Sequence, residues 1–227
     1  MRSKKIPSPQ KKSFPKELGE RIKKEAKKFF RSARGSHDWD HIERVLSLCL
    51  RIGKKEKADL EILKLAAVLH DIGRSEEDRT NGRICHSEAG AALARKILEA
   101  HGVPEEKIGR VIPCIETHRF RKKAVPATKE AKVLFDADKL DSIGAVGIGR
   151  AFLFAGEVGA RLHNKDSDIS KTMPYTREDT AFREYMVKLR WVKDRMFTRE
   201  GKRIAAERHK YMVDFFHRLD KETDGEL

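Results

Sequence analysis

The segment LEILKLAAVLHDIGR, residues 60–74, decides the fold. Apolar residues and one histidine recur in it at the i, i+3, i+4 and i+7 spacing of one helix face: Leu63, Ala66, Ala67 and His70. Further apolar residues widen this face until little of the helix is left to meet water: Ile62, Leu65, Val68 and Leu69. We therefore expect a central, buried helix that Gly73 ends.

The buried end of this helix carries the dipeptide His70-Asp71. An imidazole and a carboxylate rarely enter a protein core unless they are paired or bind metal, because burial removes the water that solvates them. A bound divalent cation usually offsets the free-energy cost of burying such a pair. The segment therefore predicts a metal site at the end of the central helix.

The composition of the 227-residue chain favours an all-α protein. Aromatic residues are few, and the alternating runs of Val, Ile and Thr that are typical of strands are essentially absent. The length and the hydrophobic content of 39% suffice for one sizeable core. We expect a basic, proline-containing arm at residues 1–15, a single helical domain at 16–222 whose closing helices occupy 176–222, and a tail at 223–227.

Periodicity and helix breakers predict where the helices lie. Ser36 is a favourable N-cap for the second helix, and Pro113 should kink the fifth helix or delay its start. Residues 76–83 and 157–175 lack a helical period and are expected to be loops. The expected helices are 16–34, 37–52, 60–74, 87–100, 105–118, 177–197 and 200–220. The last helix should bury a stripe of Ile204, Tyr211, Met212, Phe215, Phe216 and Leu219.

The formal net charge of +14 suits a polyanionic partner. Much of this charge lies in mixed-sign helical runs that are typical of a solvated surface, so a nucleic-acid partner is not favoured. The sequence has no apolar run of 18 residues and no signal-peptide core. Its three cysteines, Cys49, Cys85 and Cys114, form no CxxC pair and lie in apolar patterns. We expect a cytoplasmic protein with buried, reduced thiols and no membrane partner, and a homodimer stays open.

Four side chains of mixed imidazole and carboxylate type are candidate metal ligands. His41 lies on the core-facing side of its predicted helix, His70 and Asp71 end the central helix, and DADKLD at 136–141 supplies a further aspartate. Mixed nitrogen and oxygen ligands suit Mn, Fe, Ni, Co or Zn better than Mg or Ca, which prefer oxygen alone. Four protein ligands on an ion that takes six leave room for water and a phosphoryl oxygen.

The order and context of these residues resemble the H…HD…D signature of the HD-domain metal-dependent phosphohydrolases. The likeness extends over HDWDHIERV, AAVLHDIG, CHSEAGAALA, DADKLDSIGAVGIGRAF and KLRWVKDRMFTREGKRIAAERHKYM, and it covers roughly residues 35–220. These stretches are similar to a bacterial and archaeal subfamily of about this length. The resemblance implies a bundle of helices around a metal site, in agreement with the periodicity.

The resemblance also assigns ligands among competing residues. The family's first histidine is followed three residues later by a basic residue and Val, which selects His41 over His37. His37 is then expected near the helix cap or the pocket rim. The ADKLD-like pattern of the family puts the last ligand at Asp138 rather than at Asp136. Asp141, three residues later, is expected to hold a water or a ligating histidine from behind.

Two further histidines, His86 and His118, lie between the HD pair and the final aspartate. In HD relatives with two metals, extra histidines occur in this part of the order. One ion is expected here, and the resemblance leaves open whether this pair holds a second ion, lines the pocket or is structural. The remaining histidines are expected at the surface or in structural roles, except His209, which is a candidate to approach the pocket.

Basic residues near these ligands are candidates for binding substrate phosphate. Arg44 lies one turn after His41, Arg74 follows the HD helix, and Lys139 follows Asp138 directly. Lys139 resembles a substrate-phosphate lysine of nucleotide-cleaving relatives. Bidentate arginine contacts and point-charge lysine contacts would neutralise phosphate. Further candidates, for which an ordinary surface cation is the competing interpretation, are Lys188, Arg119, Arg121, Lys122 and Lys123.

The sequence therefore predicts a phosphohydrolase in which a metal activates water and basic side chains stabilise charge on the phosphoryl oxygens. Asp71 and Lys139 are the expected catalytic residues, with Asp71 as a ligand that also orients the water. Some nucleotidase relatives carry a glutamate just after the HD pair, where Arg74 stands here, so no general base is assigned. The resemblance points to nucleotides, and dNTP pyrophosphohydrolysis is one such reaction.

Two other interpretations stay open. The first is a basic nucleic-acid-binding protein with a vestigial HD site, which the intact ligand set argues against. The second is an HD enzyme that acts on a non-nucleotide phosphoester, or on an organic substrate at a di-iron centre. A second metal at His86 and His118 would favour this last class.

Overall fold

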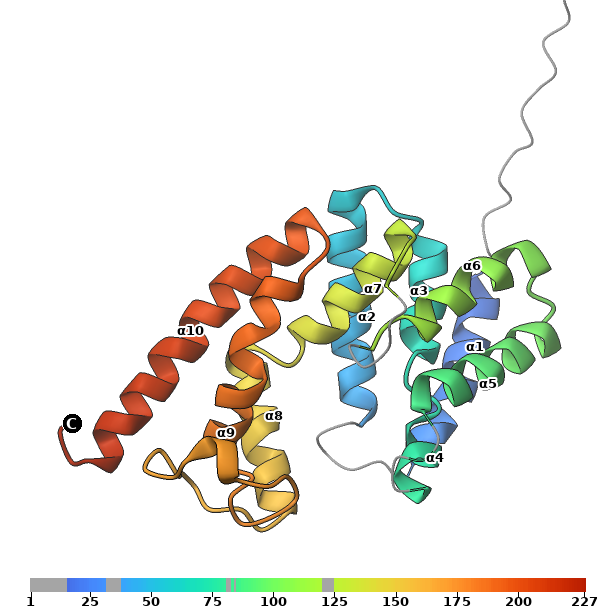
Figure 1. The fold of residues 1–227 in the computed structure, drawn as a ribbon. Helices are drawn as coiled ribbons and strands as arrows, with labels where there is room; N and C mark the ends of the chain where they lie inside the picture. Colours follow the sequence, from blue (N-terminus) through green and yellow to red (C-terminus); the bar gives the residue numbers. More distant parts are fainter. Residues whose placement is uncertain (1–15, 32–37, 81–82, 84, 120–124) are drawn as a thin grey trace, which may run out of the picture.

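The computed structural model describes residues 16–31, 38–80, 83, 85–119 and 125–227, and the structural statements below refer to these residues. The described chain consists of helices and the turns that join them, and none of these residues forms a strand (Figure 1). The all-α class predicted from the sequence is therefore confirmed. The predictions for the arm at 1–15, for Ser36, for His37 and for the basic run at 121–123 fall outside the described residues.

The helices follow one another as α1 (Lys16–Lys27), η1 (Lys28–Phe30), α2 (Trp39–Glu56), α3 (Leu60–Leu69), α4 (Arg74–Arg79), α5 (His86–Ala100), α6 (Glu105–Glu116), α7 (Lys129–Leu140), α8 (Gly144–Glu157), η3 (Ile169–Lys171), α9 (Ala181–Val187), η4 (Leu189–Arg195) and α10 (Arg199–Thr223), where η marks a 3₁₀ helix. Helices α2, α3, α6 and α7 pack together, with α1 against α3 and α5 against α6. Helix α10 runs along α8, η4 and α7 on the other side of the molecule (Figure 1).

Helix α3 is the buried helix that the sequence predicts. Seven of its ten residues are buried, and it contacts α1, α2, α6 and α7. Its first turn is capped by Asp59, whose Oδ1 accepts hydrogen bonds from the backbone N–H groups of Glu61 and Ile62. Because helices surround α3, the residues at its C-terminal end are held inside the molecule.

The expected helix end at Gly73 is wrong. Helix α3 ends at Leu69, residues 70–73 form a turn, and α4 begins at Arg74. The glycine serves a close backbone approach instead, because a Cβ at position 73 would lie 2.4 Å from the carbonyl oxygen of His86 and 2.5 Å from the amide nitrogen of Gly90. Gly73 therefore lets the HD turn pack directly on the first turns of α5.

The structure corrects two other local predictions and shows which described residue caps α2. Helix α4 overlaps the loop predicted at 76–83, because its polar side chains pair with one another and the helix packs against the neighbouring α5. The side chain that caps α2 is Asp38, which accepts from the N–H groups of Asp40 and His41. The helix predicted at 177–197 is broken at Lys188, and the 3₁₀ period of η4 then buries Leu189 and Val192, three residues apart.

The closing helix α10 buries most of the predicted stripe. Ile204, Met212 and Phe216 are buried, and Phe215 and Leu219 are partly buried against the core. Tyr211 is 54% exposed, so its predicted burial is wrong. No helix among the described residues is both long and apolar enough to cross a bilayer. Cys49 and Cys114 are buried free thiols, whereas Cys85 is partly exposed at the start of α5.

Candidate metal centre

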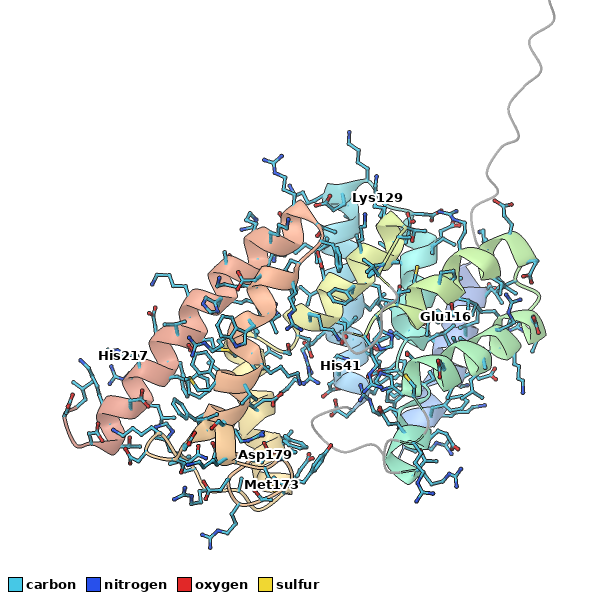
Figure 2. All side chains as sticks on the ribbon, in the orientation of Figure 1. His41, Glu116, Lys129, Met173, Asp179 and His217 are labelled. Carbon is cyan, nitrogen blue, oxygen red and sulfur yellow. The ribbon has the colours of Figure 1, made fainter. Side chains whose placement is uncertain are left out.

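Six side chains from separate parts of the chain meet where the central helices end. His41 lies in the first turn of α2, near the middle of the molecule in Figure 2. The other members come from the turn after α3, from the first residue of α5, from the residues after α6 and from the last turn of α7: His70, Asp71, His86, His118 and Asp138. Five of the six are at most 2% exposed, and the Asp138 side chain is 12% exposed.

Three of these side chains form a first group of converging donor atoms. The Nε2 atoms of His41 and His70 are 3.3 Å apart. Oδ1 of Asp138 lies 3.4 Å from Nε2 of His41 and 3.8 Å from Nε2 of His70. The structure thus brings together the imidazoles and the aspartate that the H…HD…D pattern assigned, although they are separated by up to 97 positions in the sequence, 138 minus 41.

A second group lies beside the first. Nε2 of His86 is 3.1 Å from Nε2 of His118, and the two atoms lie 3.3 and 3.4 Å from Oδ1 of Asp71. The sequence left the role of this histidine pair open between a second ion, pocket lining and a structural role. The geometry places both rings at a carboxylate of the HD pair, in a group of the kind that holds a metal ion.

Asp71 connects the two groups. Its Oδ1 faces His86 and His118, while its Oδ2 lies 3.8 Å from Nε2 of His41 and 4.0 Å from Nε2 of His70. A carboxylate can direct its two oxygens at different partners. The HD aspartate therefore lies between two sets of imidazoles, and each set faces a different oxygen.

All four imidazoles are held in the same manner, by a hydrogen bond at Nδ1. Nδ1 of His41 lies 2.8 Å from Oδ2 of Asp141. The Nδ1 atoms of His70 and His118 lie 2.8 and 2.6 Å from the carbonyl oxygens of residues 67 and 115. Nδ1 of His86 contacts Oε2 of Glu77. An N–H at Nδ1 that donates to these acceptors leaves the lone pair of each ring on Nε2, which faces the centre.

The lowered pKa values of His70 and His86 favour this arrangement. Burial lowers the pKa of His70 to about 4 and that of His86 to about 3, despite the raising effect of nearby Asp71. Burial also disfavours the charged form of His41, but hydrogen bonds with Asp138 and Asp141 outweigh it and raise the pKa of that ring. At neutral pH, His70 and His86 can therefore act as ligands without first losing a proton.

The donor atoms fit a pair of divalent transition metals. Nitrogen and oxygen ligands about 2.1 Å from one ion lie about 3 to 4 Å from each other in tetrahedral or octahedral arrangements. The donor pairs of the first group span 3.3 to 3.8 Å, and those of the second span 3.1 to 3.4 Å. In both groups, the Nε2 atoms of two rings face one another, and a shared cation would satisfy them.

Asp141 positions His41 of the first group through the contact with Nδ1, the ring nitrogen that does not face the other donor atoms. Besides His41, its carboxylate accepts hydrogen bonds from Nε and Nη2 of Arg44 at 2.8 and 3.0 Å and from Nη1 of Arg150 at 3.0 Å. Burial alone would raise the pKa of Asp141, but His41 and these arginines lower it, so the carboxylate stays charged. Arg44 is thus committed to Asp141, which separates it from the donor atoms that it was expected to assist.

Two cations contact the metal-facing carboxylates directly. Nη2 of Arg74 lies 3.0 Å from Oδ2 of Asp71, and Nζ of Lys139 lies 2.6 Å from Oδ2 of Asp138. Burial would raise the pKa values of both aspartates, but the adjacent cations and the histidines hold them well below the usual range. Both carboxylates are therefore ionised, as metal ligation requires.

Glu77 is the residue that sequence reasoning missed. Its carboxylate contacts Nδ1 of His86 and also accepts from Nη1 of Arg119 at 2.8 Å. It lies in the segment that is expected to be a loop, although its spacing of three residues from Arg74, with which it pairs at 3.5 Å, is typical of a helix. Glu77 supports the second group as Asp141 supports the first.

Other candidate residues lie elsewhere. Asp136 is buried and accepts hydrogen bonds from the N–H groups of Phe197 and Thr198, so it fixes the start of α10. Lys188 pairs with Glu184 on the exposed end of α9. Burial and the nearby charge of Lys193 lower the pKa of His209. None of these described contacts involves the six side chains of the centre.

The chain is similar to known HD proteins. The model of the HD domain family matches residues 38–143. The uncharacterized protein YpgQ of Bacillus subtilis is 38% identical over 193 residues, which cover 83% of this chain and 85% of that protein. The crystal structure of YpgQ in complex with ADP matches with a TM-score of 0.70 and 34% identity, over 90% of this chain and 97% of YpgQ.

A second solved structure, an HD-superfamily hydrolase from Bacillus thuringiensis, matches with a TM-score of 0.71 and 27% identity, over 92% of this chain and 97% of that one. The segment matched by the family model begins at the cap of α2 and ends just after α7, so it contains all six side chains of the centre. The chain belongs to the HD-domain phosphohydrolase superfamily.

Proposed function

We propose that the protein is a metal-dependent hydrolase of phosphoester or phosphoanhydride bonds and that its six convergent side chains hold two divalent transition-metal ions. The observation that carries the proposal is the position of Asp71 between two groups of imidazoles. One ion would be held by His41, His70, Asp71 and Asp138, and the other by Asp71, His86 and His118. Ions held there would supply a nucleophilic water at neutral pH and polarise a phosphoryl group.

The residues around the centre have separate tasks in this proposal. Asp71 orients the attacking water, because its carboxylate borders both groups. Lys139 and Arg74 stabilise negative charge on the phosphoryl oxygens, since both cations already lie at hydrogen-bonding distance from the ligating carboxylates. Glu77 is engaged with His86, Arg74 and Arg119, so we assign it to orienting His86 rather than to acting as a general base.

A nucleotide is the substrate class that we favour. The related YpgQ has been crystallised with ADP, and the chain carries a net charge of +14, which attracts polyanions. Hydrolysis of dNTPs with release of pyrophosphate is the specific reaction that we propose to test first.

The test is a screen of dNTPs, NTPs and NDPs with Mn, Co, Ni, Fe or Zn, in which the released phosphate or pyrophosphate is identified. We expect turnover that disappears in His70→Ala and falls strongly in Lys139→Ala. Lys188→Ala removes the same charge from a residue paired with Glu184 and should retain full turnover. Salt-sensitive binding of oligonucleotides without any hydrolysis would refute the enzyme and favour a basic nucleic-acid-binding protein.

The second histidine group also supports another candidate. An HD enzyme with two ions could act on a non-nucleotide phosphoester, or on an organic substrate at a di-iron centre, and His86 with His118 would supply the second set of ligands. Hydrolysis of p-nitrophenyl phosphate in the absence of nucleotide turnover would select the phosphoester. Dioxygen uptake by the iron-loaded protein would select the oxidative class.

A further inference from the structure

A hollow of about 370 Å³ is lined by residues of α2, α8 and α10 and by Asp141. Its lining includes three arginines and two carboxylates: Arg44, Arg51, Arg208, Glu43 and Asp141. None of the six side chains of the metal centre is among the described residues that line it. The hollow is therefore a separate site, which shares only Asp141 and Arg44 with the surroundings of the metal centre.

The two carboxylates of the hollow are already neutralised. Glu43 pairs with Nζ of Lys23 at 2.9 Å, and Asp141 receives the guanidinium groups of Arg44 and Arg150. Their charge is thus balanced by three cations, of which only Arg44 lines the hollow. The remaining cations in the lining, Arg51 and Arg208, determine its net charge.

Among the described residues, Arg51 forms one loose ion pair, with Glu200. Its Nε lies 3.8 Å from Oε1 of Glu200, beyond hydrogen-bonding distance, and its side chain is 58% exposed. Arg203 already donates to Glu200 from Nε and Nη2 at 3.0 and 2.9 Å. The guanidinium of Arg51 is therefore available to a ligand in the hollow.

Arg208 is positioned by the backbone around it. Its Nη1 donates to the carbonyl oxygen of Leu140 at 2.5 Å, and its aliphatic stem lies on Gly144. Gly144 has φ +75°, and a Cβ there would lie 2.9 Å from Cγ of Arg208. Burial and the nearby charge of Arg51 lower the pKa of Arg208, while Asp141 raises it. Two arginines that repel each other across a hollow attract an anion, because an anion between them relieves the repulsion.

An adjoining hollow of about 340 Å³ shares Arg208 and extends the site along α8 and α10. Apart from Arg208 and Glu207 its lining is mostly apolar, and it includes Tyr211, an exposed aromatic residue of α10. The carboxylate of Glu207 pairs with Nη1 of Arg203 at 3.5 Å. The two hollows together offer arginine side chains and an aromatic surface. This combination suits a phosphorylated small molecule with a planar, uncharged part.

We propose that this cleft between α2, α8 and α10 is a second ligand site, which binds the phosphoryl groups of a small molecule through Arg51 and Arg208. It differs from the metal centre and does not depend on the hydrolytic function proposed above. Metal-free protein in excess chelator should therefore retain it.

The test is calorimetric titration of chelator-treated protein with inorganic pyrophosphate and, separately, with ADP. We expect saturable, salt-sensitive binding that Arg51→Gln and Arg208→Gln each weaken roughly ten- to hundredfold, the loss typical of a hydrogen bond to a charged group. Arg218→Gln is the matched control, because Arg218 lies on the same helix and pairs with Glu222 at 2.7 Å, and it should bind normally. Lys139→Ala should also bind normally, since that residue belongs to the metal centre.

The two probes distinguish the source of the phosphoryl groups. If ADP binds more tightly than pyrophosphate and Tyr211→Ala abolishes the difference, the ligand is a nucleotide. Equal binding identifies an inorganic polyphosphate. The proposal is overturned if neither probe binds, or if binding survives Arg51→Gln and Arg208→Gln but is lost in Lys139→Ala. Because the Arg51 side chain is 58% exposed, we expect Arg51→Gln to fold normally, so a loss of binding in this variant is not explained by misfolding.

Discussion

Oδ2 of Asp141 lies 2.8 Å from Nδ1 of His41, on the side of the ring opposite to Nε2, which faces His70 and Asp138. This carboxylate fixes both the tautomer and the direction of the ring. It is itself held by Arg44 and Arg150. The first group of ligands is thus positioned by a chain of contacts that ends in two arginines.

We predict that Asp141→Asn lowers the affinity of the first group for metal by roughly ten- to hundredfold, as is typical when the carboxylate behind a ligating histidine is lost. The measurement is a competition titration of the metal with a chelating dye. Asp59→Asn is the control, because Asp59 is also a helix-associated carboxylate paired with an arginine, Arg110, at 2.9 Å. Equal metal affinity in the Asp141 variant and the wild type would show that His41 needs no such support.

Glu77→Gln should weaken the second group selectively. The substitution removes the negative charge at Nδ1 of His86, so the ring becomes a poorer and less well oriented ligand. We expect the same dye titration to show one unaltered and one weakened binding step. The neighbouring Glu76→Gln removes an equal charge that faces Arg79 instead and should leave both steps unchanged. Loss of both steps in Glu77→Gln would contradict the separation of the two groups.

Gly73→Ala should destabilise the fold by about 1–3 kcal/mol, the usual cost of overpacking. The added Cβ would collide with the backbone of α5 at His86 and Gly90. Gly149→Ala is the control, because a Cβ there meets nothing within 4 Å and removal of a mid-helix glycine stabilises a helix by about 0.5–1 kcal/mol. Urea unfolding of both chelator-treated variants measures the difference. An unaltered midpoint for Gly73→Ala would mean that α5 can move away freely.

Asp59 provides a pH-dependent part of the stability. Burial raises its pKa, but the amide of Ile62 and the guanidinium of Arg110 outweigh burial, so its pKa in the folded protein is lowered. Its contribution is therefore complete above the ordinary carboxyl pKa and is lost as the pH falls through the folded value. We predict that Asp59→Ala costs about 1 kcal/mol at neutral pH, and that this cost shrinks below about pH 4. Urea unfolding of the wild type and the variant at pH 7 and pH 3 measures this loss of stability. A larger loss at pH 3 than at pH 7 would contradict the prediction.

The sequence predicted the side chains that face the metal centre but few of the residues that hold them in place. His41, His70 and Asp71 were found from helix periodicity and the HD pair, whereas the choice of Asp138 over Asp136 needed the family pattern. The physical reason is that both aspartates are polar residues in an apolar helix segment. Only the fold shows that one faces the imidazoles, whereas the other accepts hydrogen bonds from the backbone that leads into α10.

Local polarity concealed other features. Most of helix α4 falls in the loop predicted at 76–83 because its sequence, RSEEDR, has no apolar face, although its inner face is made of Arg74 and Glu77. Gly73 was interpreted through helix-ending chemistry, while its actual constraint is contact with a helix that begins 13 positions later, at His86. Contacts of this kind depend on tertiary packing and leave no periodic signal in the chain.

The central claim is that Asp71 divides its two oxygens between two metal ions, and a metal count tests it most directly. The protein is loaded with excess Mn, freed of unbound metal by gel filtration and measured by elemental analysis, alongside circular dichroism to confirm helix content. We predict two ions per chain in the wild type, one in His118→Ala, and none in Asp71→Ala, which should also lose turnover. One ion in the wild type, or an unchanged count in His118→Ala, would contradict it.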